Sequence, residues 1–207
     1  SLICRNSKIM ANIDLPLIQE LRARTGVGMM DCKKALIEAS GDMEKAVELL
    51  RKKGASVAAK RAGNVTSEGL VHAYIHAGSQ IGVLIEINCE TDFVARTNDV
   101  KEFAHDVAMH IAAMKPQSID ATDLSADFIA KERIFFKEQL IAEGKPAGIV
   151  DKIVEGKVEK LYSEVCLMNQ KFIKNDKKSI NDLLQELIAK MGEKIKINKF
   201  IRYEVGT

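Results

Sequence analysis

The chain has 207 residues, of which 46% are hydrophobic and 29% are charged, a composition typical of a soluble globular protein with a sizeable buried core. Its 31 basic and 29 acidic residues almost cancel to a net charge of +2, so we expect no direct binding to nucleic acid. No apolar run approaches the roughly 20 residues that span a bilayer, so we expect no membrane attachment.

The four cysteines, Cys4, Cys32, Cys89 and Cys166, lie far apart in the sequence. Without CxxC spacing or a His-rich segment beside them, they indicate neither a zinc cluster nor a disulfide framework. We therefore predict a reducing, cytoplasmic location, with no metal site and no cofactor. Residues 1–12 are expected to be an N-terminal extension, in part non-native, because the sequence from Met10 resembles a natural start.

Residues 13–54 are predicted to form a domain of three short helices, each bounded by capping or turn residues. The third helix is expected to be capped by Asp42 and to end at Gly54. In the second helix, Met30 projects about 160° from the centre of the apolar stripe, at about 100° per residue. Ile37 lies near Met30 on this outer face, which resembles an adaptable partner surface, although single exposed apolar residues need no function.

Residues 55–67 are expected to be a basic linker. The wider stretch Arg51–Asn64 holds five basic and no acidic residues, which is typical of a hinge or an extended arm solvated by its own charge. A basic run of this length can also contact phosphate, but no aromatic side chains for stacking lie nearby.

From Glu68 the apolar period changes from 3.6 to 2, so residues 68–207 are predicted to be an α+β domain. Two strands are expected to form a hairpin, and a third, whose apolar residues alternate with polar ones, to join them, because a hairpin alone is marginal. The three strands are predicted over Leu70–His76, Ile81–Cys89 and Ile195–Val205. Helices are predicted over residues 99–114, Ser125–Glu143, Ala147–Val165 and 179–191, the middle two as a helical hairpin.

No catalytic motif is present. His72 and His76 lie about 13 Å apart on one strand, His105 and His110 face different directions on a helix, and all four are expected to be partly exposed polar residues. Gly26-Val-Gly28 lacks the preceding strand and the following lysine of a phosphate-binding loop, so it indicates a tight turn between helices. We therefore expect a binding or regulatory protein and not an enzyme.

The segment Thr91-Asp-Phe-Val94 connects the second strand to the following helix, and two interpretations stay open. Phe93 can turn inward and plug the end of the sheet while Asp92 caps a turn. Alternatively, Phe93 and the Asp92 carboxylate project from a rigid strand end as a wedge that fits a partner's pocket. The pattern alone does not decide between them.

Several blocks of sequence follow one another along almost the whole chain from Met10: Arg22–Leu36, Glu38–Asp42, Ala62–Asn64, Asn88–Arg96, Met109–Ala113 and Phe200–Gly206. Together they closely resemble bacterial translation elongation factor Ts. The resemblance implies a guanine-nucleotide exchange factor for elongation factor Tu, with an N-terminal bundle of the ubiquitin-associated type.

The resemblance also implies which residues bind the partner. They are Thr91, Asp92, Phe93 and Val94 near the partner's magnesium site, and Arg22, Met29 and Met30 in the N-terminal domain. Longer members of the family carry a second β-subdomain and a coiled-coil insertion, so this sequence resembles the short form, in which a second chain supplies the missing half. We therefore expect a homodimer formed through the sheet-bearing unit.

Two other functions stay open from the residues alone. The chain could be an adaptor that binds another protein through Met30 and Ile37 without changing nucleotide release. It could also be a small-molecule enzyme that uses Asp92 or Glu90 as acid or base, although no second converging polar group is evident.

Overall fold

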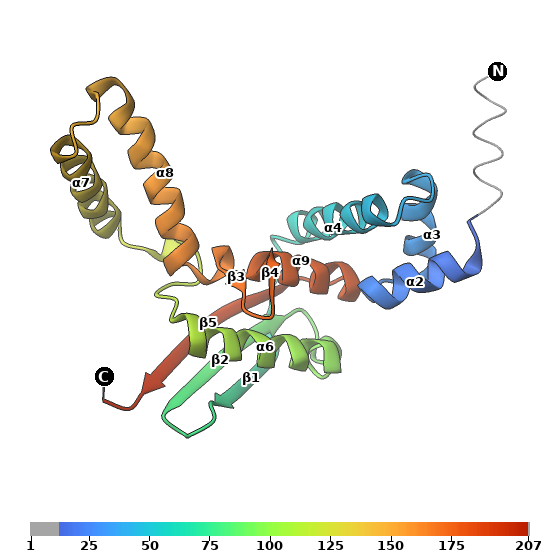
Figure 1. Cartoon of the computed structure of the whole chain (residues 1–207). Helices are drawn as coiled ribbons and strands as arrows, with labels where there is room; N and C mark the ends of the chain where they lie inside the picture. The colour runs from blue at the N-terminus through green and yellow to red at the C-terminus, as the bar shows by residue number, and fades with distance from the viewer. Residues whose placement is uncertain (1–12, 207) are drawn as a thin grey trace, which may run out of the picture. The chain divides into compact units, whose positions relative to one another are not determined.

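The computed structural model describes residues 13–206, so the predicted extension over residues 1–12 lies outside the described residues. The chain divides into two compact units, and Figure 1 labels its helices and strands. The first holds residues 13–71, 86–104 and 182–198, and the second holds residues 72–85, 105–181 and 199–206. The order of elements confirms the α+β class: helices come first, then a small sheet with further helices. The predicted domain boundaries at residues 54 and 67 stay a prediction.

The N-terminal helices α2 (Leu15–Thr25), α3 (Met29–Glu38) and α4 (Met43–Lys60) enclose a small apolar core. Gly26 adopts a φ of 68° and ends α2, a backbone conformation that favours glycine. The Asp42 carboxylate accepts a hydrogen bond from the backbone N–H of Lys45 at 3.1 Å, which confirms the predicted cap of α4. The buried side chains are Ile18, Leu21, Val27, Cys32, Ala35, Leu36, Ala39, Ala46 and Leu50.

Helix α4 continues through Gly54 to Lys60, so the expectation that it ends at this glycine is wrong. A Cβ on Gly54 would lie 2.5 Å from the backbone oxygen of Gln185 and 2.9 Å from the Cβ of Ala189. Both residues belong to α9 (Ile180–Met191). The glycine is therefore needed because two helix backbones approach each other closely at this point, and not because the helix stops.

The basic stretch is also not an arm solvated by its own charge. Four of its five basic side chains form ion pairs within the chain: Arg51 with Asp182, Lys52 with Glu48, Lys53 with Asp31, and Arg61 with Glu90. The acidic partners lie outside the basic run, so the sequence window that defined the run did not contain them. Because these basic side chains are paired within the chain, fewer of them are available to bind the phosphates of a nucleic acid.

The sheet has three strands, β1 (Glu68–Ile75), β2 (Ile81–Cys89) and β5 (Ile195–Glu204), in the order β1-β2-β5. The distant third strand predicted from the sequence is therefore confirmed. On the central strand β2, Val83, Ile85, Ile87 and Cys89 are all buried. This is the alternating face that the sequence predicts.

The burial pattern of β5 changes phase at its middle. Ile195 and Ile197 are buried, but the consecutive residues Asn198 and Lys199 are both exposed, and beyond them Ile201 and Tyr203 point outward. The burial along this strand therefore does not follow the simple alternation predicted for it, and its phase changes at Asn198 and Lys199. As a consequence, the apolar side chains of the second half of β5 do not belong to the buried core.

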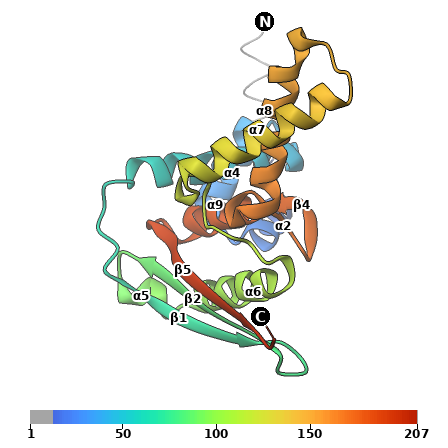
Figure 2. The same ribbon diagram turned by 90° about the vertical axis from the view of Figure 1, so that its left-hand side faces the viewer.

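In the second unit, the C-terminal half of α6 (Asn98–Met114) lies beside the strands (Figure 2). The Arg202 guanidinium on β5 donates two hydrogen bonds, at 3.2 and 3.1 Å, to the carbonyl oxygen of Ala112. Helices α7 (Ala126–Ala142) and α8 (Ala147–Val165) form the predicted helical hairpin around Leu140, Val150, Val154 and Val158. A small hairpin of β3 (Lys171–Phe172) and β4 (Asn175–Ser179) follows, which the sequence did not predict.

The histidines differ from the expectation of partial exposure in one case, because His110 is fully buried. Its Nε2–H donates to Oε1 of Gln170 at 2.9 Å, and its Nδ1 accepts from the N–H of Ile173 at 3.4 Å. These partners select the neutral ring, and burial lowers the pKa of His110 although the bond to Gln170 opposes this shift. His110 is thus a structural residue that holds the β3–β4 hairpin.

The close approach at Gly54 predicts a stability difference between two glycine substitutions. Gly54→Ala should reduce the free energy of unfolding, because overlap with α9 outweighs the gain in helix propensity of about 1 kcal/mol. Gly156→Ala, within α8 and with no atom within 4 Å of the new Cβ, should raise it by about 1 kcal/mol. Urea unfolding followed by circular dichroism measures both, and equal stabilisation by the two variants would contradict the packing argument.

Candidate partner-binding site

The segment Thr91–Val94 follows directly from β2 and enters a one-turn helix, α5 (Asp92–Ala95). Thr91 is the N-cap of this helix, and its Oγ1 accepts a hydrogen bond from the N–H of Val94 at 3.5 Å. Asp92 lies in the first turn, where its carboxylate pairs with Arg96 at 2.9 Å. Thr91 therefore has the capping role that one interpretation of the sequence gave to Asp92.

The side chain of Phe93 is 80% exposed. The interpretation in which this ring plugs the end of the sheet is therefore wrong. The ring projects from the surface, as the other interpretation expects, and its fit to a partner's pocket stays a prediction. The small residue Ala95 is the one buried beneath the helix, so α5 is seated on its opposite side and directs Phe93 outward. Leaving a phenylalanine in water forgoes about 2 kcal/mol of burial free energy, which becomes available when a partner covers the ring.

Hydrogen bonds of Thr91 with Glu193 and with Cys89 fix the start of α5. The backbone N–H and the hydroxyl of Thr91 donate to the two carboxylate oxygens of Glu193, at 3.1 and 2.8 Å. Cys89, the last residue of β2, donates its thiol to the carbonyl oxygen of Thr91 at 3.1 Å. Burial raises the pKa of this thiol, and the charge of Glu193 adds to the shift, so Cys89 stays protonated and donating.

Glu90, the residue before Thr91, is held from three directions. Its carboxylate accepts from the N–H of Lys194 at 2.6 Å, from the guanidinium of Arg61 at 2.8 and 3.0 Å, and from the amide of Asn64 at 2.9 Å. These donors, foremost the backbone N–H of Lys194, lower the pKa of Glu90. A carboxylate with this many donors is an anchor and a poor base.

The N-terminal candidates lie on α2 and α3. Met30 is 67% exposed, which confirms its predicted outward direction, whereas Met29 is half-buried and packs against the core of the three helices. Arg22 is exposed on α2. Ile37 is only half-buried, so the predicted Met30–Ile37 surface is less apolar than the sequence pattern indicates.

The anchors of Thr91 were not found from the sequence. Glu193 is 102 residues from Thr91, and Arg61 is 29 residues from Glu90. No local spacing links such partners, and Glu193 stands in an ordinary polar turn after α9. The sequence around it, Met191-Gly-Glu-Lys-Ile195, carries no specific signal.

The described part of the chain offers little to other kinds of site. Within residues 13–206, no group of three or more His, Cys, Asp or Glu side chains is placed to hold a metal ion. Over the same residues, no helix combines the length and the apolar character needed to cross a bilayer. The cysteines Cys32, Cys89 and Cys166 are free thiols.

Comparison with known proteins identifies the family. The family model described as "Elongation factor TS" matches residues 20–207. Elongation factor Ts of Desulforamulus reducens is 54% identical over 197 residues, which cover 95% of this chain and 91% of the relative. The corresponding proteins of Carboxydothermus hydrogenoformans and Moorella thermoacetica are each 57% identical, over 92% and 91% of this chain and 88% and 93% of their own lengths. An exposed aromatic ring on a firmly anchored turn thus occurs in a chain that belongs to the elongation factor Ts family.

Proposed function

We propose that the protein is a guanine-nucleotide exchange factor for elongation factor Tu in the bacterial cytoplasm. The observation that carries the proposal is the 80% exposure of Phe93 on an anchored one-turn helix, in a member of a family of translation elongation factors. The chemistry needed is binding and not bond making, so the protein is proposed not to be an enzyme. An exchange factor binds the nucleotide-free state of its partner more tightly than the loaded state.

In the proposed mechanism, Phe93 enters an apolar pocket between helices of elongation factor Tu. Its entry displaces the elements that hold Mg²⁺ and the phosphates. Mg²⁺ has strict octahedral geometry and relies on phosphate oxygens and waters, so a small shift of its surroundings weakens nucleotide binding. Asp92 assists by exchanging its pair with Arg96 for polar groups of the partner. The coupling is reciprocal, so high GDP weakens binding of the factor equally.

The anchoring of Glu90 argues against the enzyme alternative. Both of its oxygens are engaged by Arg61, Asn64 and Lys194, and Asp92 is paired with Arg96. Neither carboxylate is poised to take a proton from a substrate. The adaptor alternative differs from the proposal in one measurable respect, since an adaptor leaves the rate of nucleotide release unchanged.

The N-terminal helices are proposed to supply a second contact with the G domain of the partner. Met30 provides an exposed, flexible apolar side chain, Arg22 provides an exposed charge, and Met29 supports Met30 from the core. A thioether adapts its shape to the surface that it meets. This contact contributes to affinity, whereas Phe93 contributes to the release step.

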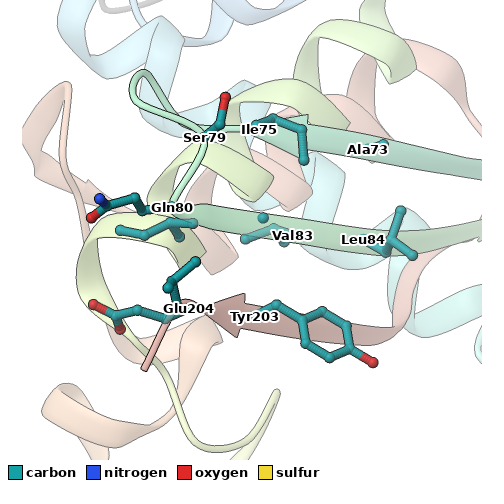
Figure 3. Close-up of a pocket in the computed structure, with 11 residues that line it drawn as sticks. Ala73, Ile75, Ser79, Gln80, Val83, Leu84, Tyr203 and Glu204 are labelled. Carbon is teal, nitrogen blue, oxygen red and sulfur yellow. The ribbon is translucent and has the colours of Figure 1, made fainter. Parts of the chain in front are cut away.

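The outer face of the sheet supports a homodimer. Arg202 and Glu204 are engaged on the α6 side of β5, so Tyr203 between them points to the opposite side. There it lies with Ile75 of β1 and Leu84 of β2 along a hollow of about 550 Å³ (Figure 3). Their exposures are 67%, 63% and 45%. An open sheet face of an antiparallel sheet is normally polar, so an apolar one is suited to burial against a second copy.

Phe93→Ala should abolish most of the acceleration of GDP release. Loss of a buried phenylalanine side chain at the interface corresponds to a reduction of about 30-fold or more in the rate. The measurement is release of fluorescent GDP from elongation factor Tu after mixing with the factor. Phe135→Ala, which removes another exposed ring (60%) on α7, is the matched control and should keep the wild-type rate. An unchanged rate with a folded Phe93→Ala variant would refute the wedge.

Met30→Ala should weaken the affinity of the factor for nucleotide-free elongation factor Tu by about fivefold, while leaving the free energy of unfolding within about 0.5 kcal/mol of wild type. Isothermal titration calorimetry gives the affinity. Met114→Ala at the end of α6, also exposed (46%), is the control and should bind like wild type. Wild-type affinity of Met30→Ala would remove α3 from the proposed interface.

Tyr203→Asp should convert a dimer into a monomer, because it places a charge on the apolar face of the sheet. Light scattering at micromolar concentration should give twice the 22.9 kDa chain mass for wild type and a single chain mass for the variant. Phe135→Asp on α7 carries the same change outside the sheet and should stay dimeric. A monomeric wild-type chain would contradict the dimer directly.

A further inference from the structure

The end of α9 and the turn that follows it contact residues on both sides of α5. Going forward along residues 190–194, the contacts go backward along residues 90–99. Lys190 pairs with Asp99, the sulfur of Met191 lies 3.9 Å from Oγ1 of Thr97, Glu193 holds Thr91, and the N–H of Lys194 reaches Glu90 at 2.6 Å. The two segments thus run antiparallel, and α5 stands between the contacted positions.

Among these contacts, that of Glu193 acts most directly on α5. Its carboxylate is an acceptor only, so Thr91 must direct both its N–H and its hydroxyl hydrogen toward it. The hydroxyl oxygen then offers a lone pair to the first turn of α5, where the N–H of Val94 lies at 3.5 Å. Glu193 therefore orients the cap of α5 and satisfies an N–H that precedes the helix.

A helix of one turn is not stable by itself in water. Its direction depends on what holds its ends, which here are the buried Ala95 and the capped Thr91. If the cap is released, Phe93 samples several directions, and entry into a pocket then costs the entropy of selecting one of them. Exposure makes the Phe93 ring accessible to a partner, and the cap fixes the direction in which the ring projects.

We propose that Glu193 is a positioning residue for Phe93: it sets the direction in which the ring meets the partner, and so controls nucleotide release without contacting the partner's nucleotide site. The inference rests on the proposed exchange function and adds to it a residue 102 positions away in sequence from the segment it controls. A purely structural role of Glu193 is the alternative. In that case its effect would not depend on the presence of the Phe93 ring.

A double-mutant cycle separates the two roles. Glu193→Gln keeps the shape of the side chain but presents an amide hydrogen to one of the two donors of Thr91. In the Phe93 background it should slow the maximal rate of fluorescent-GDP release from elongation factor Tu about tenfold, with the half-saturating concentration changed less than about twofold. In the Phe93→Ala background it should slow release no further. Glu159→Gln, on the exposed surface of α8, is the matched control with no effect in either background.

Amide hydrogen exchange of the free protein gives an independent readout. The Thr91 amide should exchange about tenfold faster in Glu193→Gln, while amides in the core of α8 keep their wild-type rates. Equal slowing of release in both backgrounds, an unchanged release rate, or an unchanged Thr91 amide would each overturn the positioning role. A wild-type chain that does not accelerate release at all would overturn the exchange function itself, and the inference with it.

Discussion

The structure around α5 depends on two adjacent positions, Glu90 and Thr91, that are tied to the segment after α9 by charge-assisted hydrogen bonds. Each carboxylate involved has its oxygens matched to donors, so the energy of taking these charges partly out of water is compensated locally. Without such bonds, a single helical turn at the end of a strand would have no fixed direction. The exposed Phe93 ring has a defined direction only because these bonds hold the start of α5.

Phe93 and the outer face of the sheet are apolar surfaces of different kinds. Phe93 is a single ring that stands out from an anchored turn, a shape that fits a concave surface. The outer face of the sheet around Leu84 and Tyr203 instead presents several exposed apolar side chains along one hollow, and in the proposed homodimer it would be buried against the same face of a second copy.

Local patterns predicted the elements with regular periodicity. The bounds of β2 agree with its predicted range, Ile81–Cys89, because alternation over nine residues defines a half-buried strand. The outward direction of Met30 followed from helix geometry alone. The direction of Phe93 did not, because a turn of four residues has no period and its burial depends on residues far away in sequence.

The wrong expectations share this cause. Gly54 carries the sequence signal of a helix end, yet it marks a close approach to α9 that no local pattern reports. His110 is a polar residue of the amphipathic helix α6. Its burial depends on a hydrogen bond to Gln170, which lies 60 residues further along the chain. Local sequence determines the bounds of the helices and strands, whereas the polar contacts that hold these elements involve residues far away in the sequence.

The separation between Thr91 and Glu193 also has a consequence for synthesis on the ribosome. When α7 and α8 have emerged from the ribosome, the nascent chain still lacks the acceptor for the start of α5, because Glu193 is translated later. Contacts this distant in sequence form late in folding, since closing the loop between them costs entropy before any bond is made. The start of α5, which sets the direction of Phe93, is therefore expected to be among the last parts of the molecule to fold.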